Sequence, residues 1–154
     1  MKILVTAATA FIAISSLAWA HGDHEHAAAT YGEPGDPAKT SREVVVVMKE
    51  ADGRMLFAPD AITVTKGEQV RFRLRNEGEL AHEFLLGTAA EIDEHADIMK
   101  AMPDMVHDDP NAKRVDSMAN ADLLWHFTSA GEFAFACLIP GHREAGMTGK
   151  IIVH

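Results

Sequence analysis

The chain has 154 residues, of which 14 are basic and 23 acidic, and its formal net charge at pH 7 is −9. Such an acidic balance argues against nucleic acid and anionic membrane surfaces as partners and favours a cation or a basic protein. The length suits a single domain with a tail, and the single cysteine excludes a disulfide within the chain.

The N-terminus has the pattern of a secretory signal peptide. Lys2 precedes a mostly apolar run, which closes on the small-x-small sequence Ala18-Trp19-Ala20. The alternative, an uncleaved anchor, is disfavoured because the run contains threonines and serines and is followed at once by the polar sequence HGDHEH. We therefore expect residues 1–20 to be removed and the mature protein to lie in the periplasm without a membrane span.

The segment after the predicted cleavage point has the composition of a tail. Residues 21–42 combine His, Ala, Gly, Pro and charged residues without apolar periodicity. This composition predicts a disordered, His-rich segment, because few apolar side chains are available to form a core. We expect the folded domain to cover residues 43–154.

Short strands are predicted along most of this domain. Segment 69–76 is the clearest, because Val70, Phe72 and Leu74 share one face and three arginines share the other, as in a half-buried antiparallel strand. About seven or eight such strands separated by turns predict an all-β sandwich or barrel. The segments with strand character are 43–49, 54–58, 61–65, 69–76, 82–87, 123–127, 132–137 and 149–154.

One insert of helix and loop, residues 88–118, interrupts the strands. The sequence from Thr88 to Ala101 is rich in helix formers, and Thr88 with Glu91 three residues later forms the pattern of a capping box. Pro103 ends the predicted helix, and a long polar loop follows. The apolar stripe that we expect to pack on the domain comprises Ile92, Ala96 and Met99.

The single cysteine stands where a strand runs into a compact loop. Alternation in segment 132–137 places Cys137 on the inward face together with two phenylalanines. The loop that follows contains a proline and two glycines before the chain returns as a strand, so His142 and Met147 come back close to Cys137. A buried, inert cysteine is the alternative, but it leaves the histidine and the methionine unexplained.

A thiolate, an imidazole and a thioether at one point are ligands that together select copper. Two imidazoles and a thiolate with a weak axial methionine are typical of a blue-copper electron-transfer site. Because the loop supplies one histidine, a second must come from a neighbouring strand, and His82 at the start of segment 82–87 is the candidate. Copper also accounts for an unpaired thiol in an exported protein, since a coordinated thiolate is deprotonated and shielded.

At these residues the chain resembles the cupredoxins, the small blue copper proteins that include azurin, plastocyanin, rusticyanin and auracyanin. The resemblance covers residues 43–154 outside the insert and rests on the sequences AHEF and CLIPGHREAGMTGKIIV. Four residues separate Cys137 from His142, and another four separate His142 from Met147. This spacing is similar to that of rusticyanin and auracyanin.

The resemblance implies a Greek-key cupredoxin fold, one-electron copper(I)/copper(II) chemistry and a defined ligand set. It assigns His82, Cys137 and His142 as equatorial ligands and Met147 as the axial ligand. One departure is Glu83, because many cupredoxins carry Asn or Ser directly after the first histidine. Groups around the ligands tune the metal, so this position bears on the reduction potential.

Catalytic copper is not expected. Multicopper oxidases flank the cysteine with histidines, whereas Ala136 and Leu138 stand there in this chain, and a binuclear centre would require a second cysteine. The sequence also lacks a nucleophile elbow, a phosphate-binding loop and a zinc-binding helix motif. We therefore expect a protein that is not an enzyme, with oxidation of copper(I) as the open alternative.

The histidines and methionines exceed the needs of one copper site. After cleavage, the amine and imidazole of His21 could chelate copper with His24 or His26, and the alternative is a tail with weak, adventitious affinity. A second group lies around the end of the predicted helix, where thioethers can hold copper(I) but are more often packing residues. Its members are Met102, Met105 and His107.

Two functions fit these observations. The first is copper handling and tolerance in the periplasm, indicated by the His-rich tail, the Met/His segment and the acidic balance, and similar to copper-tolerance cupredoxins. The second is a dedicated soluble electron carrier, in which one blue site moves electrons between redox partners. Both functions require a partner protein that exchanges copper or electrons with this one.

Overall fold

A computed structural model of the chain describes residues 29–102 and 109–154. The predicted signal peptide, residues 1–20, lies outside the described residues. So do five of the accessory ligand candidates, His21, His24, His26, Met105 and His107. The predicted four-ligand site and its surroundings lie entirely within the described part.

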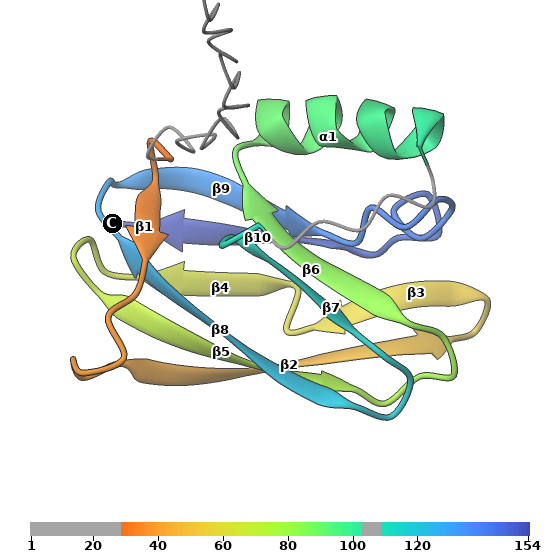
Figure 1. Cartoon of the computed structure of the whole chain (residues 1–154), viewed down its shortest axis with the longest axis horizontal. Coiled ribbons are helices and arrows are strands. Elements are labelled where there is room, and N and C mark those ends of the chain that lie inside the picture. The colour runs from red at the N-terminus through yellow and green to blue at the C-terminus, as the bar shows by residue number, and fades with distance from the viewer. Residues whose placement is uncertain (1–28, 103–108) are drawn as a thin grey trace, which may run out of the picture.

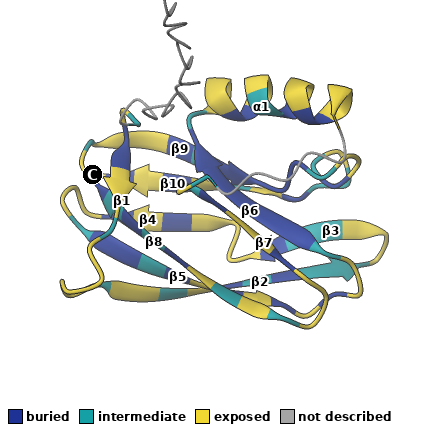
Figure 2. Ribbon diagram, viewed as in Figure 1, coloured by how far each residue is buried: buried dark blue, intermediate teal, exposed yellow. Residues whose placement is uncertain are grey.

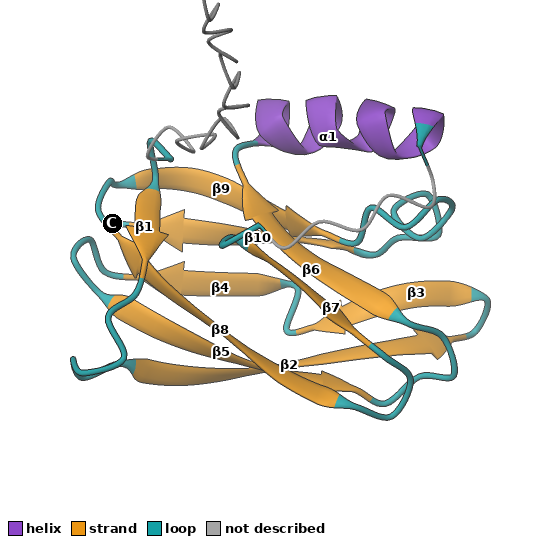
Figure 3. Ribbon diagram, viewed as in Figure 1, coloured by secondary structure: helices purple, strands orange, loops and turns teal. Residues whose placement is uncertain are grey.

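Within these described ranges, ten strands form two sheets that pack face to face, with one helix beside them (Figures 1 and 3). The first sheet contains, in spatial order, β1 (Gly32–Pro34), β8 (Asn120–Phe127), β5 (Gln69–Asn76), β2 (Arg42–Ala51) and β3 (Arg54–Ala58). The second contains β4 (Ala61–Val64), β10 (Thr148–Val153), β9 (Gly131–Ala136), β6 (His82–Gly87) and β7 (Ala112–Val115). The predicted all-β sandwich is thereby confirmed.

Aromatic side chains from both sheets make the centre of the core. Phe57 and Phe72 from the first sheet meet Phe84 and Phe135 from the second, with ring centroids 5.1–5.9 Å apart. Edge-to-face and offset contacts at such distances stabilise aromatic pairs beyond their burial alone. Figure 2 shows the buried positions along the inner faces of both sheets. The core therefore fixes the second sheet, which carries the predicted ligands, firmly against the first.

Strand β5 has the predicted faces and one pairing that differs from the prediction. Val70, Phe72 and Leu74 are fully buried, as their alternation indicates. The strand is antiparallel to β8 but parallel to β2, with Phe72 opposite Val44. Alternation reports only which face is buried, so it did not distinguish the two pairing directions.

Two short edge strands lie in segments that the sequence analysis assigned to irregular structure. Strand β1 falls within residues 21–42, and the neighbouring Tyr31 is buried and donates a hydrogen bond from its hydroxyl to the carbonyl of Leu86 at 2.9 Å. Strand β7 falls within the predicted polar loop and pairs with β6. Each strand has too few apolar residues to produce a recognisable alternation, which is why the sequence did not predict it. Because β1 comes before Glu43, ordered structure begins earlier in the chain than predicted.

Helix α1 (Ala89–Ala101) forms as predicted. The hydroxyl of Thr88 accepts a hydrogen bond from the backbone N–H of Glu91, and the Glu91 carboxylate accepts one from the backbone N–H of Thr88, which completes the capping box. Its buried stripe packs beside β6 and β9 and comprises Ile92, Ala96 and Met99. In the described part of the chain, no helix has the length and apolar character to cross a membrane.

Candidate metal centre

His82 opens strand β6 and reaches the interior directly. Every residue of β6 is buried, because the strand lies between β7 and β9 and is covered by helix α1. The side chain of His82 is fully buried. His82 is paired with Val115 of β7, and its buried ring has little freedom to turn.

Cys137, His142 and Met147 come from one tight loop between β9 and β10. The loop closes on itself, because the backbone N–H of Cys137 donates to the carbonyl of Met147 at 3.1 Å and the N–H of Met147 donates to the carbonyl of His142 at 3.1 Å. The N–H of His142 in turn donates to the carbonyl of Ile139. Cys137 and Met147 are fully buried and His142 nearly so. The chain thus holds three predicted ligands in one preformed turn.

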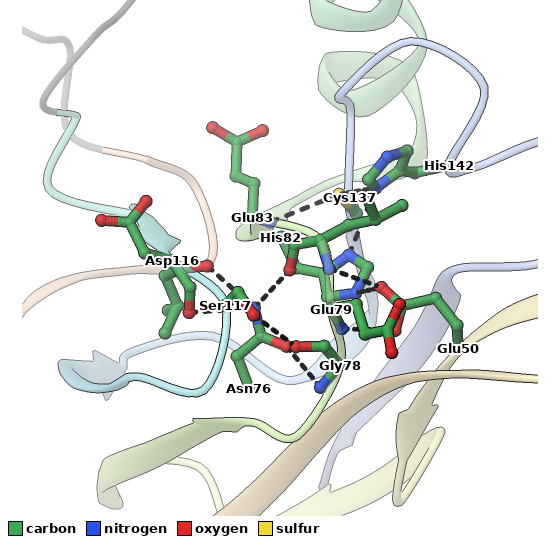
Figure 4. A network of polar contacts seen from close by, with 12 residues as sticks. Glu50, Asn76, Gly78, Glu79, His82, Glu83, Asp116, Ser117, Cys137 and His142 are labelled. Atoms are coloured by element: carbon green, nitrogen blue, oxygen red, sulfur yellow. Dashed lines mark hydrogen bonds and ion pairs between the residues drawn. The ribbon is translucent and has the colours of Figure 1, made fainter.

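The structure brings the cysteine and both histidines together as predicted (Figure 4). The Nδ1 atoms of His82 and His142 are 3.2 Å apart, and Cys137 Sγ is 3.3 Å from His142 Nδ1. All three ligand atoms lie within 4.8 Å of one another. Metal–nitrogen and metal–sulfur bonds of about 2.0–2.3 Å, the values for zinc, put two donors of one ion about 3.4 Å apart. The donor set therefore fits a single metal ion.

A family model described as copper binding proteins of the plastocyanin/azurin family matches residues 44–154. The chain belongs to this family. Within a plastocyanin/azurin-type domain, a donor set of one thiolate, two imidazoles and one thioether is the blue-copper set. The cupredoxin domain therefore carries a type 1 copper site formed by His82, Cys137, His142 and Met147.

Three curated relatives of this cupredoxin bear the name copper-resistant cuproprotein CopI. The one from Rubrivivax gelatinosus is 55% identical over 133 residues, which cover 86% of this chain and 79% of that protein. The one from Pseudomonas aeruginosa is 37% identical, with 97% of this chain and 93% of that protein covered. A third, from Vibrio cholerae, is 36% identical, with 78% of this chain and 70% of that protein covered.

Among solved structures, two auracyanins share the fold of this cupredoxin. Auracyanin B has a TM-score of 0.62 at 19% identity, and the match covers 82% of this chain and 96% of that one. Auracyanin A, from Chloroflexus aurantiacus, has a TM-score of 0.58 at 23% identity, with 73% of this chain and 99% of that one covered. These likenesses confirm the cupredoxin fold.

Burial sets the protonation of the ligands. Burial raises the pKa of the Cys137 thiol to about 12, so the thiol holds its proton at neutral pH in the metal-free protein. Burial lowers the pKa of His82, although the neighbouring Glu50 carboxylate acts in the opposite direction. Burial, with the nearby His82, also lowers the pKa of His142. Both imidazoles are therefore neutral near pH 7 and offer lone pairs to a metal.

The residue after the first histidine acts through its backbone. Glu83 departs from the Asn or Ser common at this position, but its backbone N–H donates to Cys137 Sγ at 3.3 Å. Any residue except proline provides that donor, which would stabilise the sulfur's negative charge as a thiolate. The Glu83 side chain is largely buried and stands opposite Arg114 in the pairing of β6 with β7.

Glu50 is a residue near the site that the sequence analysis missed. One of its carboxylate oxygens lies 2.8 Å from His82 Nε2, on the side of the ring away from the other ligands (Figure 4). Glu50 is on strand β2 in the opposite sheet, at a turn-proximal position where an exposed acid is ordinary. No sequence pattern marks it, because the contact depends on how the two sheets pack.

Of the accessory ligand candidates, the described residues include Met102 alone. The thiolate and two histidines are the only group of metal-ligating His, Cys, Asp and Glu side chains in residues 29–102 and 109–154. Met102 lies at the C-terminal cap of helix α1 with half of its surface exposed. Met99 is buried, as predicted for a packing residue.

Proposed function

We propose that this protein serves copper resistance in the periplasm, as a blue copper protein that cycles between copper(I) and copper(II). The observation that carries the proposal is the 55% identity, over 86% of the chain, with a protein named copper-resistant cuproprotein. Two further relatives with the same name come from other bacteria. The predicted signal peptide at residues 1–20 supports the location.

Within this site we propose distinct roles for the four ligands. His82, Cys137 and His142 have donor atoms that face one another at the separations that one ion requires. By the match to the family motif, these three residues would hold copper as the equatorial ligands and Met147 would be the axial ligand. A copper ion bound there supplies one-electron redox chemistry. The packed sheets and the closed loop keep the donors in one arrangement, which limits the rearrangement at each electron transfer.

A growth experiment tests the role. Deletion of the gene should reduce growth when copper is added to the medium and leave growth at trace copper unchanged, and a plasmid copy should restore it. A plasmid copy with Cys137→Ser should fail to restore growth, because the thiolate is the strongest ligand of the set. Normal growth of the deletion strain in high copper would contradict the proposal.

A dedicated electron carrier is the second candidate. The observation that favours it is that the described residues contain one group of metal-ligating His and Cys side chains, as an electron carrier requires. This function predicts a respiratory or photosynthetic defect in the deletion strain at trace copper. The same growth experiment therefore separates the two candidates by the copper concentration at which the defect appears.

We infer that His21, His24, His26, Met102, Met105 and His107 bind additional copper more weakly. Their support is the ligand chemistry of histidine and methionine and the exposure of Met102. Copper titration of the mature protein should show more than one equivalent bound, and removal of residues 21–26 should lower that stoichiometry.

We also propose that the protein is not an enzyme. Multiple turnovers of copper(I) oxidation in oxygenated buffer would contradict this.

A further inference from the structure

Glu50 joins the copper site from the opposite sheet. It lies near the end of β2, whereas His82 begins β6, so the contact spans the interior of the sandwich. Glu50 Oε1 is 2.8 Å from His82 Nε2, a separation typical of a hydrogen bond to a charged acceptor. His82 Nε2 has no hydrogen-bond partner of regular geometry among the described residues, so the 2.8 Å separation alone indicates the pairing with Glu50.

The same carboxylate also organises the turn that leads into His82. Its oxygens accept hydrogen bonds from the backbone N–H groups of Glu79 at 2.9 Å and Leu80 at 3.1 Å. Gly78 allows this close approach, because a Cβ atom at that position would lie 2.2 Å from Glu50 Oε2. The turn therefore wraps around the carboxylate.

A second set of hydrogen bonds holds this turn from the other side (Figure 4). The Asn76 side chain accepts a hydrogen bond from the N–H of Gly78 and donates to the carbonyls of Leu80 and Asp116. The Ser117 hydroxyl donates to the carbonyl of Gly78. With the backbone fixed on both sides, the Glu50 carboxylate and the His82 ring keep their relative positions.

The two nitrogens of His82 face different partners. Nδ1 faces the other ligands, 3.2 Å from Nδ1 of His142, and Nε2 faces the Glu50 carboxylate. Both oxygens of Glu50 accept backbone N–H groups, those of Glu79 and Leu80, as an ionised carboxylate does. An ionised carboxylate only accepts hydrogen bonds, so it favours a proton on Nε2 and leaves the Nδ1 lone pair for the metal.

We propose that Glu50 is a positioning residue of the copper site, which holds His82 in the tautomer with its proton on Nε2 and favours copper(II) over copper(I) by its negative charge. The inference rests on the proposed type 1 copper site. A carboxylate that accepts the outer N–H of a ligand histidine makes the imidazole a stronger donor. Copper(II), the more highly charged ion, is stabilised more than copper(I) by the stronger imidazole donor and by the nearby Glu50 carboxylate.

The first part of the test uses Glu50→Gln. The amide oxygen can replace Oε1, which faces His82 and accepts from Leu80. The amide nitrogen then replaces Oε2 and cannot accept the N–H of Glu79, so that hydrogen bond of the turn is lost as well. The acceptor for the ring is then kept and the charge is lost. We expect copper(II) affinity to fall about 10-fold or more while copper(I) affinity changes less. Each 10-fold fall in the affinity ratio, the affinity for copper(II) divided by the affinity for copper(I), raises the reduction potential by about 59 mV.

Matched variants separate this role from loss of charge or of fold. Glu79→Gln removes a negative charge from the same turn. The backbone N–H of Glu79 donates to Glu50, but its carboxylate takes no part in the network. We therefore expect this variant to leave the affinity ratio unchanged. Gly78→Ala keeps the charge but displaces the carboxylate, because the new Cβ would occupy its place. We expect Gly78→Ala to change the affinity ratio in the same direction as Glu50→Gln.

A measurement on the metal-free protein tests the tautomer directly. Nitrogen NMR of the imidazole rings should show His82 protonated at Nε2 in the wild type, in Glu79→Gln and in Glu50→Gln, and a substantial Nδ1-protonated population in Glu50→Ala. An Nδ1-protonated His82 in the wild type would overturn the inference. Equal affinity ratios in wild type and Glu50→Gln would also overturn it. A wild type without thiolate-to-copper absorption would instead refute the proposed copper site, and the NMR result would still decide the contact.

Discussion

Met147 is the proposed axial ligand of the copper site. A long axial bond contributes little to copper affinity but changes the potential. We therefore expect Met147→Leu, a swap of similar volume that costs less than about 1.5 kcal/mol in a core, to keep copper and raise the reduction potential. Absorption spectra and voltammetry of the variant measure both. A variant that cannot retain copper would contradict the axial assignment.

Cys137 is a buried thiol whose proton must leave when copper binds. Because its pKa in the metal-free protein is about 12, one proton is displaced per copper ion throughout the neutral range. Raising the pH removes the competing proton, so apparent copper affinity should rise about tenfold per pH unit between pH 7 and 9, where the histidines are already neutral. Competition titrations at several pH values measure the slope. A flat profile would show that the thiol is not a ligand or is already ionised.

Helix α1 covers the outer face of the second sheet, the face opposite to the one into which the Cys137 side chain points. Its stripe packs with Leu85, Ala136 and Leu138, and Arg143 of the ligand loop pairs with Asp93 of the helix at 2.6 Å. The insert thus lies against the segments on both sides of Cys137. We infer that the helix supports the ligand loop as well as extending the core.

A matched pair of isoleucines tests whether the helix packs on the domain. Ile92→Ala empties a buried position and should lower the free energy of unfolding by about 2–5 kcal/mol. Ile98→Ala changes the same residue type at an exposed position of the same helix and should stay within about 0.5 kcal/mol. Urea unfolding of the metal-free variants measures both values. Equal effects would show that the helix does not pack as a structural element of the domain.

The elements that the sequence did not predict share one property. Strands β1 and β7 are short edge strands, and they gain order from pairing with β8 and β6 and not from a pattern of their own. By contrast, the capping box and stripe of α1 are local signals, and local signals were sufficient to predict the helix. Prediction therefore failed where order depends on a partner strand far along the chain.

At the scale of the whole molecule, the site was predictable in its ligands and not in its support. Cys137, His142 and Met147 share one loop, so residue type and spacing revealed them, and His82 followed from the need for a second imidazole. Glu50 approaches from the other sheet. Nothing in the order of residues records that contact, because it exists only once the two sheets have packed.

Copper binding should stabilise the whole domain, since the site links β6 to the loop between β9 and β10. A ligand that binds only the folded state adds about 2.7 kcal/mol at a free concentration 100 times its Kd. We expect the thermal midpoint to rise with copper concentration in the wild type and to rise much less in Cys137→Ser. Thermal unfolding at a series of copper concentrations measures this. An identical rise in both proteins would place the stabilising copper elsewhere.

The ligand loop has a further consequence for how the protein acquires its metal. In a denatured chain the donor groups of Cys137, His142 and Met147 are still close together in the sequence. His82 is no longer held near them. Copper supplied at that stage binds the unfolded chain. Binding to the unfolded chain reduces the free energy by which copper stabilises the folded state. Refolding yield should therefore depend on the order of addition, with chains that fold first and meet copper afterwards recovering best.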